Sequence, residues 1–172
     1  ALDSFPCTLI QGYGQTEATM ALTFLTAGDH RRALAGQPGL LRSCGRAVFG
    51  TELKIVNTEG QECAPGEVGE VLARGPQLMQ GYWQRPEATA ETIVDGWLHT
   101  GDVARMDSEG FVYIQDRIKD MIISGGENVY PAEIENLLQT HDDISEAAII
   151  GQPSETWGES PFAIIVRTDE KL

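Results

Sequence analysis

The segment Gly12-Tyr13-Gly14-Gln15-Thr16-Glu17 brings together an aromatic ring, a hydroxyl and a carboxylate on a loop-like stretch that contains two glycines. An aromatic ring such as that of Tyr13 can stack on a base. A threonine hydroxyl can donate to a phosphate oxygen, and a carboxylate such as that of Glu17 suits Mg²⁺. A simpler interpretation is also open, in which Tyr13 is an ordinary tyrosine and Thr16 caps a helix leading into the apolar run 18–25.

A second polar segment, Trp97-Leu98-His99-Thr100-Gly101-Asp102, ends on a carboxylate. One carboxylate can accept hydrogen bonds from both hydroxyls of a ribose, although an aspartate after a glycine can also stabilise a turn. Arg117 can donate hydrogen bonds to a polar ligand or form an exposed ion pair with a neighbouring aspartate, which would contribute little. His99 has no evident partner that would make it a catalytic base, and we expect it either to be structural or to lie near a substrate pocket.

Short β-strands are predicted to position these groups. Alternation at 52–55 and the apolar-rich run 66–73 predict strands, and Pro86 should open a short helix. Asp95-Gly96 marks a tight turn, and a further strand is expected to end at Ile114. The fold class is therefore α+β, and a small, mostly antiparallel β unit closes the part of the chain that spans residues 1–115.

After Asp116 the pattern changes. A short strand at 121–123 leads to Gly125-Gly126, where glycine permits either a plain β-turn or the close approach of a ligand. A helix should follow, and the apolar runs 147–150 and 162–166 fit buried strands. We expect residues 116–172 to form the beginning of a β-α-β domain.

Composition excludes several classes of partner. The chain of 172 residues carries 26 acidic and 12 basic side chains, a formal net charge of −14. This balance argues against nucleic-acid binding, because neutralising phosphates requires clustered Lys and Arg. Three widely spaced cysteines favour neither a disulfide framework nor a zinc site and suggest a cytoplasmic protein. We expect neither a transmembrane segment nor a signal peptide.

Three separated segments together resemble motifs of the adenylate-forming superfamily, and in particular of its AMP-forming acyl-CoA synthetases. Segment 12–17 resembles the aromatic-Gly-x-Thr-Glu motif, and the stretch 81–102 resembles the central motif. Residues 116–135, from Asp116-Arg117-Ile118-Lys119-Asp120 to Glu135, resemble the hinge motif. The order and spacing also match, so the resemblance covers nearly the whole chain.

The resemblance implies a reaction in two steps. A carboxylic acid, with a fatty acid as the first choice, reacts with ATP to give an acyl-adenylate and pyrophosphate, and coenzyme A then displaces AMP. It implies adenine binding by Tyr13 in the motif with Gly14, and catalytic contacts of Thr16 with phosphate and of Glu17 with Mg²⁺.

The remaining roles implied by the resemblance concern the ribose and the second step. Asp102 and Arg117 would bind the ribose of ATP or AMP, and Asp116 would be the hinge about which a C-terminal domain rotates. Gly125 and Gly126 would line the channel for the pantetheine arm of coenzyme A.

Two parts of these enzymes have no counterpart in the sequence. These are the phosphate-binding loop, which lies upstream of segment 12–17, and a catalytic lysine, which lies beyond Leu172. We therefore expect a fragment that does not adenylate its substrate alone. The run 18–25 should then be partly exposed or paired in a homodimer. Two alternatives stay open: a piece of an amino-acid adenylation domain that loads a carrier protein, and a non-catalytic module that binds a nucleotide or a partner protein.

Overall fold

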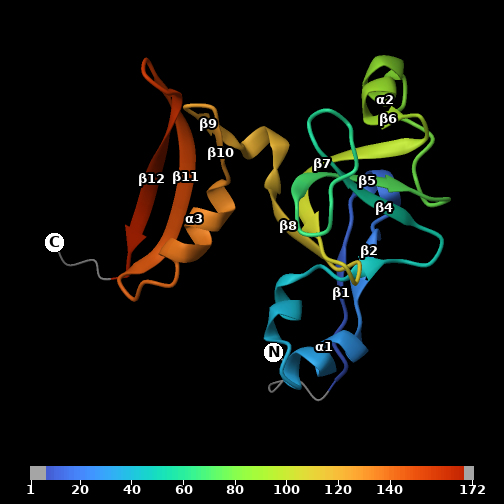
Figure 1. Cartoon of the computed structure of the whole chain (residues 1–172). Helices are drawn as coiled ribbons and strands as arrows, with labels where there is room; N and C mark the ends of the chain where they lie inside the picture. Colours follow the sequence, from blue (N-terminus) through green and yellow to red (C-terminus); the bar gives the residue numbers. More distant parts are fainter. Residues whose placement is uncertain (1–6, 169–172) are drawn as a thin grey trace. The chain divides into compact units, whose positions relative to one another are not determined.

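The computed structural model describes residues 7–168 and divides the chain into two compact units, 1–114 and 115–172 (Figure 1). The first unit contains a three-stranded sheet of order β1-β2-β3 and a five-stranded sheet of order β4-β5-β7-β6, in which β8 pairs with β7. The elements in chain order are β1 Gln11–Tyr13, the 3₁₀ helix η1 Thr16–Ala18, β2 Thr23–Leu25, α1 Ala27–Leu34, the 3₁₀ helix η2 Pro38–Arg42, β3 Arg46–Ala47, β4 Glu52–Val56, β5 Val68–Arg74, α2 Pro86–Thr92, β6 Ile93–Val94, β7 Trp97–Met106 and β8 Val112–Arg117.

Local sequence signals account for the turns of the five-stranded sheet. The Asn57 side chain accepts the backbone N–H groups of Glu59 and Gln61 and so closes the turn after β4. Asp95 and Gly96 both have positive φ, 51° and 79°, which is the conformation that joins β6 to β7 in a tight hairpin. The Asp95-Gly96 turn and the start of α2 at its proline agree with the sequence-based expectation.

The core of the first unit consists of three neighbouring clusters of buried side chains. In one cluster the fully buried Phe111 packs with Leu25 and Leu40. The guanidinium groups of Arg32 and Arg46 lie 5.5 and 4.8 Å from the centre of its ring. The other two clusters consist of Cys44, Ile55, Val71, Ala104 and Val112, and of Ala18, Leu22, Ala73 and Leu98.

The second unit is a four-stranded sheet of order β10-β9-β12-β11 with one helix packed against β11. Its elements are the 3₁₀ helix η3 Ile118–Asp120, β9 Ile122–Ser124, β10 Glu127–Val129, α3 Pro131–Leu138, β11 Ile144–Ser154 and β12 Gly158–Arg167. The expected succession of strand, helix and strand is present, and the strand pairs within this sheet are antiparallel. The expectation that the runs 147–150 and 162–166 are buried is wrong, because Ile150, Phe162 and Ile164 are 44%, 45% and 48% exposed. The mixed α+β class predicted from the sequence is confirmed.

Two local expectations are settled by these elements. The prediction that a strand ends at Ile114 is wrong, because β8 continues to Arg117 through residues that carry no apolar signal. The run 18–25 is not fully buried within the chain, since Met20 is 82% and Phe24 43% exposed. Among the helices that the structure describes, none has the length and apolar character needed to cross a membrane.

The buried aromatic ring of the core provides a stability test with a matched control. We expect Phe111→Ala to lower the free energy of unfolding by about 3–5 kcal/mol, because it leaves a cavity in a packed cluster. Phe49 is fully exposed, so Phe49→Ala should change it by no more than about 0.5 kcal/mol. Urea denaturation followed by fluorescence measures both, and equal effects would contradict this description of the core.

Candidate functional site

Asp102 lies in a segment of β7 that is longer than the strand it pairs with. Leu72 of β5 lies opposite His99, but Glu70 lies opposite Val103, so Val71 alone faces the inserted residues 100–102. Such a bulge leaves backbone groups without ladder partners and redirects side chains. Gly101 adopts φ 72°, a left-handed conformation that suits glycine. The bulge therefore explains why a glycine precedes Asp102.

The Asp102 carboxylate is joined to Tyr13 from the other motif. The Tyr13 hydroxyl donates to Asp102 Oδ2 at 2.6 Å, across 89 residues of sequence. Asp102 is only 8% exposed, and the Tyr13 ring packs against two of the buried clusters. Gln15 strengthens the junction, because its amide donates to the Thr100 carbonyl at 3.3 Å. The structure thus brings two of the sequence-predicted nucleotide residues together.

Burial raises the pKa of the Tyr13 hydroxyl far above its usual value near 10. The hydrogen bond to Asp102 and the negative charge of that carboxylate raise it further. Tyr13 therefore stays neutral and remains a hydrogen-bond donor to Asp102 at any ordinary pH.

Gly14, Thr16 and Glu17 follow on the short connection after β1. A Cβ on Gly14 would lie 2.1 Å from the Met20 carbonyl oxygen, so no larger residue fits this backbone. Thr16 is exposed and begins the 3₁₀ helix, whose N-cap residue Gln15 makes no side-chain cap bond. The alternative in which Thr16 caps a helix is therefore wrong.

The carboxylate of Glu17 has a partner that the sequence did not suggest. The Tyr82 hydroxyl donates to Glu17 Oε1 at 2.8 Å, and this hydrogen bond is the main reason that the pKa of Tyr82 is raised. The Glu17 backbone carbonyl accepts the Met79 N–H at 2.7 Å, which anchors the same connection. Within residues 7–168 no group of three or more His, Cys, Asp or Glu side chains forms a complete metal site.

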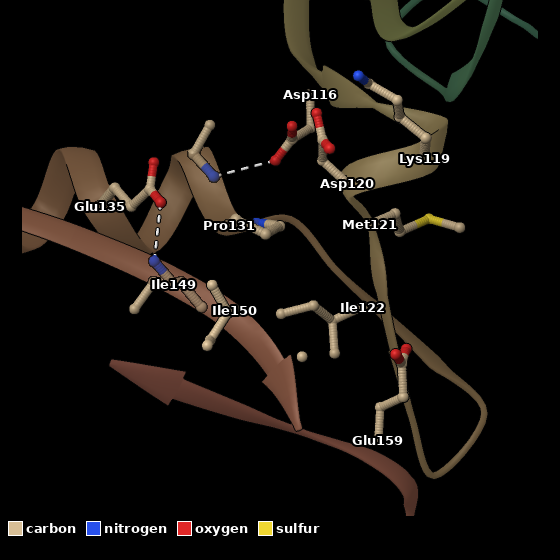
Figure 2. Close-up of a pocket in the computed structure, with 12 residues that line it drawn as sticks. Asp116, Lys119, Asp120, Met121, Ile122, Pro131, Glu135, Ile149, Ile150 and Glu159 are labelled. Atoms are coloured by element: carbon tan, nitrogen blue, oxygen red, sulfur yellow. Dashed lines mark hydrogen bonds between the residues drawn. The ribbon is translucent and has the colours of Figure 1, made fainter. Parts of the chain in front are cut away.

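Asp116 belongs to the second unit and ties the end of β8 to α3. Its Oδ1 accepts the Arg117 N–H at 2.8 Å and its Oδ2 accepts the Ala132 N–H at 3.0 Å. Figure 2 shows this carboxylate beside the start of α3, at the edge of a cavity of about 390 Å³. Glu135 from α3 likewise accepts the Ile149 N–H at 2.8 Å, so the cavity walls are joined by carboxylates.

Gly125 and Gly126 form the turn between β9 and β10. Their φ values of 60° and 88° are left-handed, as the plain-turn interpretation requires. A Cβ on Gly125 would come within 2.7 Å of the Trp157 ring, whereas a Cβ on Gly126 would meet nothing within 4 Å. Gly126 is thus the more open of the two toward an approaching molecule.

The main residue that the sequence analysis missed is Glu70 of β5. Its Oε2 lies 2.8 Å from Nδ1 of His99, and its Oε1 accepts the Gly101 N–H at 3.0 Å. The sequence did contain a signal, because Glu70 is the one charged residue within the run 68–73 of this strand. The partner of that carboxylate could be found only from the pairing of β5 with β7.

The chain is similar in sequence to a group of known enzymes. The family model for AMP-binding enzymes matches residues 1–83, and the model for the C-terminal domain of AMP-binding enzymes matches residues 133–172. A medium/long-chain-fatty-acid–CoA ligase of Mycobacterium tuberculosis is 43% identical over 166 residues, covering 96% of this chain and 28% of the ligase. A feruloyl-CoA synthase of Amycolatopsis is 46% identical over 160 residues, covering 93% and 31%.

Solved structures extend the similarity to the fold. The o-succinylbenzoate CoA synthetase of Bacillus subtilis, in complex with its acyl-adenylate intermediate, matches with a TM-score of 0.82 and 38% identity over 95% of this chain and 32% of that enzyme. The same enzyme in complex with ATP and a magnesium ion matches with a TM-score of 0.80 and 38% identity over 92% and 31%. The chain thus spans about 30% of the length of these relatives.

The neutral, buried state of Tyr13 can be tested by titration. The pKa of Tyr13 is higher in the folded chain than in the unfolded chain, where it is about 10. Neutral Tyr13 therefore stabilises the fold fully below a pH of about 10, and this stabilisation is lost as the pH rises toward the folded-state pKa. Between pH of about 10 and 11.5, Tyr13→Phe should therefore leave the phenolate absorbance of the folded chain unchanged. In urea the same substitution should remove one tyrosine from the titration. A smaller amplitude in the folded variant would mean that Tyr13 ionises in the native state.

Proposed function

The chain belongs to the family of AMP-binding enzymes, and on that premise we propose that it is the nucleotide-binding part of an AMP-forming acyl-CoA synthetase. The reaction proposed for the whole protein joins a carboxylic acid to coenzyme A, with ATP converted to AMP and pyrophosphate. Taken alone, the chain is not expected to carry out this reaction.

The observation that carries the proposal is the hydrogen bond between Tyr13 and Asp102. It unites two motif residues from distant parts of the chain in one partly buried junction. We assign Asp102 to the two ribose hydroxyls, because one carboxylate can accept hydrogen bonds from both. We assign the face of Tyr13 to adenine and Gly14 to the same binding segment. That a solved relative is in complex with ATP and a magnesium ion supports nucleotide binding by this chain.

Glu17 and Thr16 are proposed to serve the phosphates and the metal ion. A bound Mg²⁺ would neutralise phosphate charge, and it is usually held by only one or two carboxylates besides water and phosphate oxygens. A single glutamate oriented by Tyr82 fits that requirement without a larger acidic cluster. Thr16 is exposed beside it and can donate its hydroxyl to a phosphate oxygen.

The second unit is proposed to serve the step with coenzyme A. Asp116 is assigned as the hinge, since it lies two residues past the boundary between the compact units. Arg117 would contact the ribose, and Gly125 and Gly126 would border the path of the pantetheine arm. The open space above Gly126 supports the last assignment.

The acyl group is left at the level of a carboxylic acid. Relatives of nearly equal similarity are named for medium- and long-chain fatty acids and for ferulate. A fatty acid stays our first choice and an aryl acid the second. We propose a cytoplasmic location, because an odd number of widely spaced cysteines does not suit a disulfide framework. A homodimer that covers Met20 and Phe24 stays a prediction.

Binding of AMP by the chain tests the proposal directly. We expect weak binding that Asp102→Ala reduces about tenfold or more, because hydrogen bonds to a charged acceptor are lost. Asp142→Ala removes the same charge at an exposed site in the second unit and should leave binding unchanged. Calorimetric titration with AMP and with ATP·Mg²⁺ gives the affinities. Equal affinities for the unchanged chain and the Asp102 variant would place the nucleotide elsewhere.

A further inference from the structure

The inserted residues 100–102 of β7 need hydrogen-bond partners that the strand ladder cannot provide. Only Val71 faces them on β5, and its carbonyl accepts the Thr100 hydroxyl at 2.8 Å. The Asp102 N–H then donates to that same Thr100 hydroxyl oxygen at 3.1 Å. The Gly101 N–H is left over. An unpaired N–H in a half-buried site would destabilise the folded state, so the group that accepts this N–H stabilises the conformation of the insertion.

That acceptor is the carboxylate of Glu70. One of its oxygens binds Gly101 within the insertion, and the other binds His99 just before it. Oε1 accepts the Gly101 N–H at 3.0 Å, and Oε2 lies 2.8 Å from Nδ1 of His99, just before the insertion. The Glu70 side chain is only 18% exposed, so these contacts lie in a site with little competing water. A hydrogen bond to an ionised acceptor in such a site is stronger than one between neutral groups.

Asp102 is consequently held by its side chain, by its own N–H and by the residue before it. Tyr13 binds Oδ2 of its side chain, Thr100 Oγ1 binds its N–H, and Glu70 binds the N–H of Gly101, one peptide earlier. Gly101 has no side chain to restrict its own rotation, so without the Glu70 contact its peptide could turn. A change of the Gly101 backbone angles would move the Asp102 carboxylate away from its position beside Tyr13.

We propose that Glu70 is a positioning residue for nucleotide binding, which orients Asp102 to receive the two ribose hydroxyls by holding the Gly101 peptide. This inference rests on the proposed function, because it takes Asp102 as the ribose contact. His99 keeps the Glu70 carboxylate in place from the opposite side. The role predicts an effect on ribose recognition in particular, whereas a purely structural carboxylate would affect every ligand equally.

The test compares AMP with 2′,3′-dideoxyadenosine monophosphate, which lacks both ribose hydroxyls. NMR titration of the full chain should show that AMP binds more tightly than the dideoxy compound. Glu70→Ala should weaken AMP binding about tenfold, to the level of the dideoxy compound, and leave the dideoxy affinity unchanged. Glu70→Gln keeps an oxygen acceptor for Gly101 and should retain most of the preference. Glu67→Ala, which also removes a carboxylate bound to a backbone N–H, serves as the matched control.

A second measurement needs no ligand. The amide proton signal of Gly101 should move upfield in Glu70→Ala, because it loses a charged acceptor, and should return toward its original position in Glu70→Gln. An unchanged Gly101 signal would show that Glu70 does not hold this peptide, and the inference would be wrong.

The titrations distinguish a failure of the proposed function from a failure of the role proposed for Glu70. If the unchanged chain does not prefer AMP over the dideoxy compound, the ribose role of Asp102 is wrong, and the proposed function and this inference fail together. If that preference exists but persists in Glu70→Ala, or if both nucleotides weaken equally, only the positioning role of Glu70 is contradicted.

Discussion

The insertion in β7 is the constraint on which the candidate site depends. Three residues face one across the pairing of β5 with β7, so the local backbone cannot be satisfied by the sheet itself. Side chains complete its hydrogen bonds instead, from Thr100 within the insertion and from Glu70 on the neighbouring strand. Asp102 leaves the regular pleat for this reason, and its carboxylate can meet a residue from an entirely different segment.

The junction of Tyr13 with Asp102 joins this insertion to the core. The Tyr13 ring packs between two buried clusters, and its hydroxyl reaches the carboxylate at 2.6 Å. A tyrosine suits this place because it combines a large apolar body with one polar end. The packing of the first unit therefore sets the position of the Tyr13 hydroxyl, and through it the position of the Asp102 side chain.

Acidic side chains in both units accept hydrogen bonds that stabilise the fold. Burial opposes ionisation of Asp29, but hydrogen bonds from Thr26 and the charges of Arg46 and Arg32 keep its pKa below the usual range. Asp116 and Glu135 accept backbone N–H groups around the cavity of the second unit. Part of the net charge of −14 thus consists of carboxylates that complete backbone hydrogen bonds within the fold.

Local patterns in the sequence were sufficient for the fold class, the Asp95-Gly96 hairpin, the start of α2 and the resemblance of the three motifs. These features depend on neighbouring residues, because alternation, proline and glycine act on the backbone over a few positions. The continuation of β8 to Arg117, the bond between Tyr13 and Asp102, and the contacts of Glu70 with His99 and Gly101 required the tertiary structure. Tyr13 and Asp102 lie 89 residues apart, and the contacts of Glu70 depend on the register between β5 and β7. Local spacing in the sequence encodes neither the long-range contact nor the register.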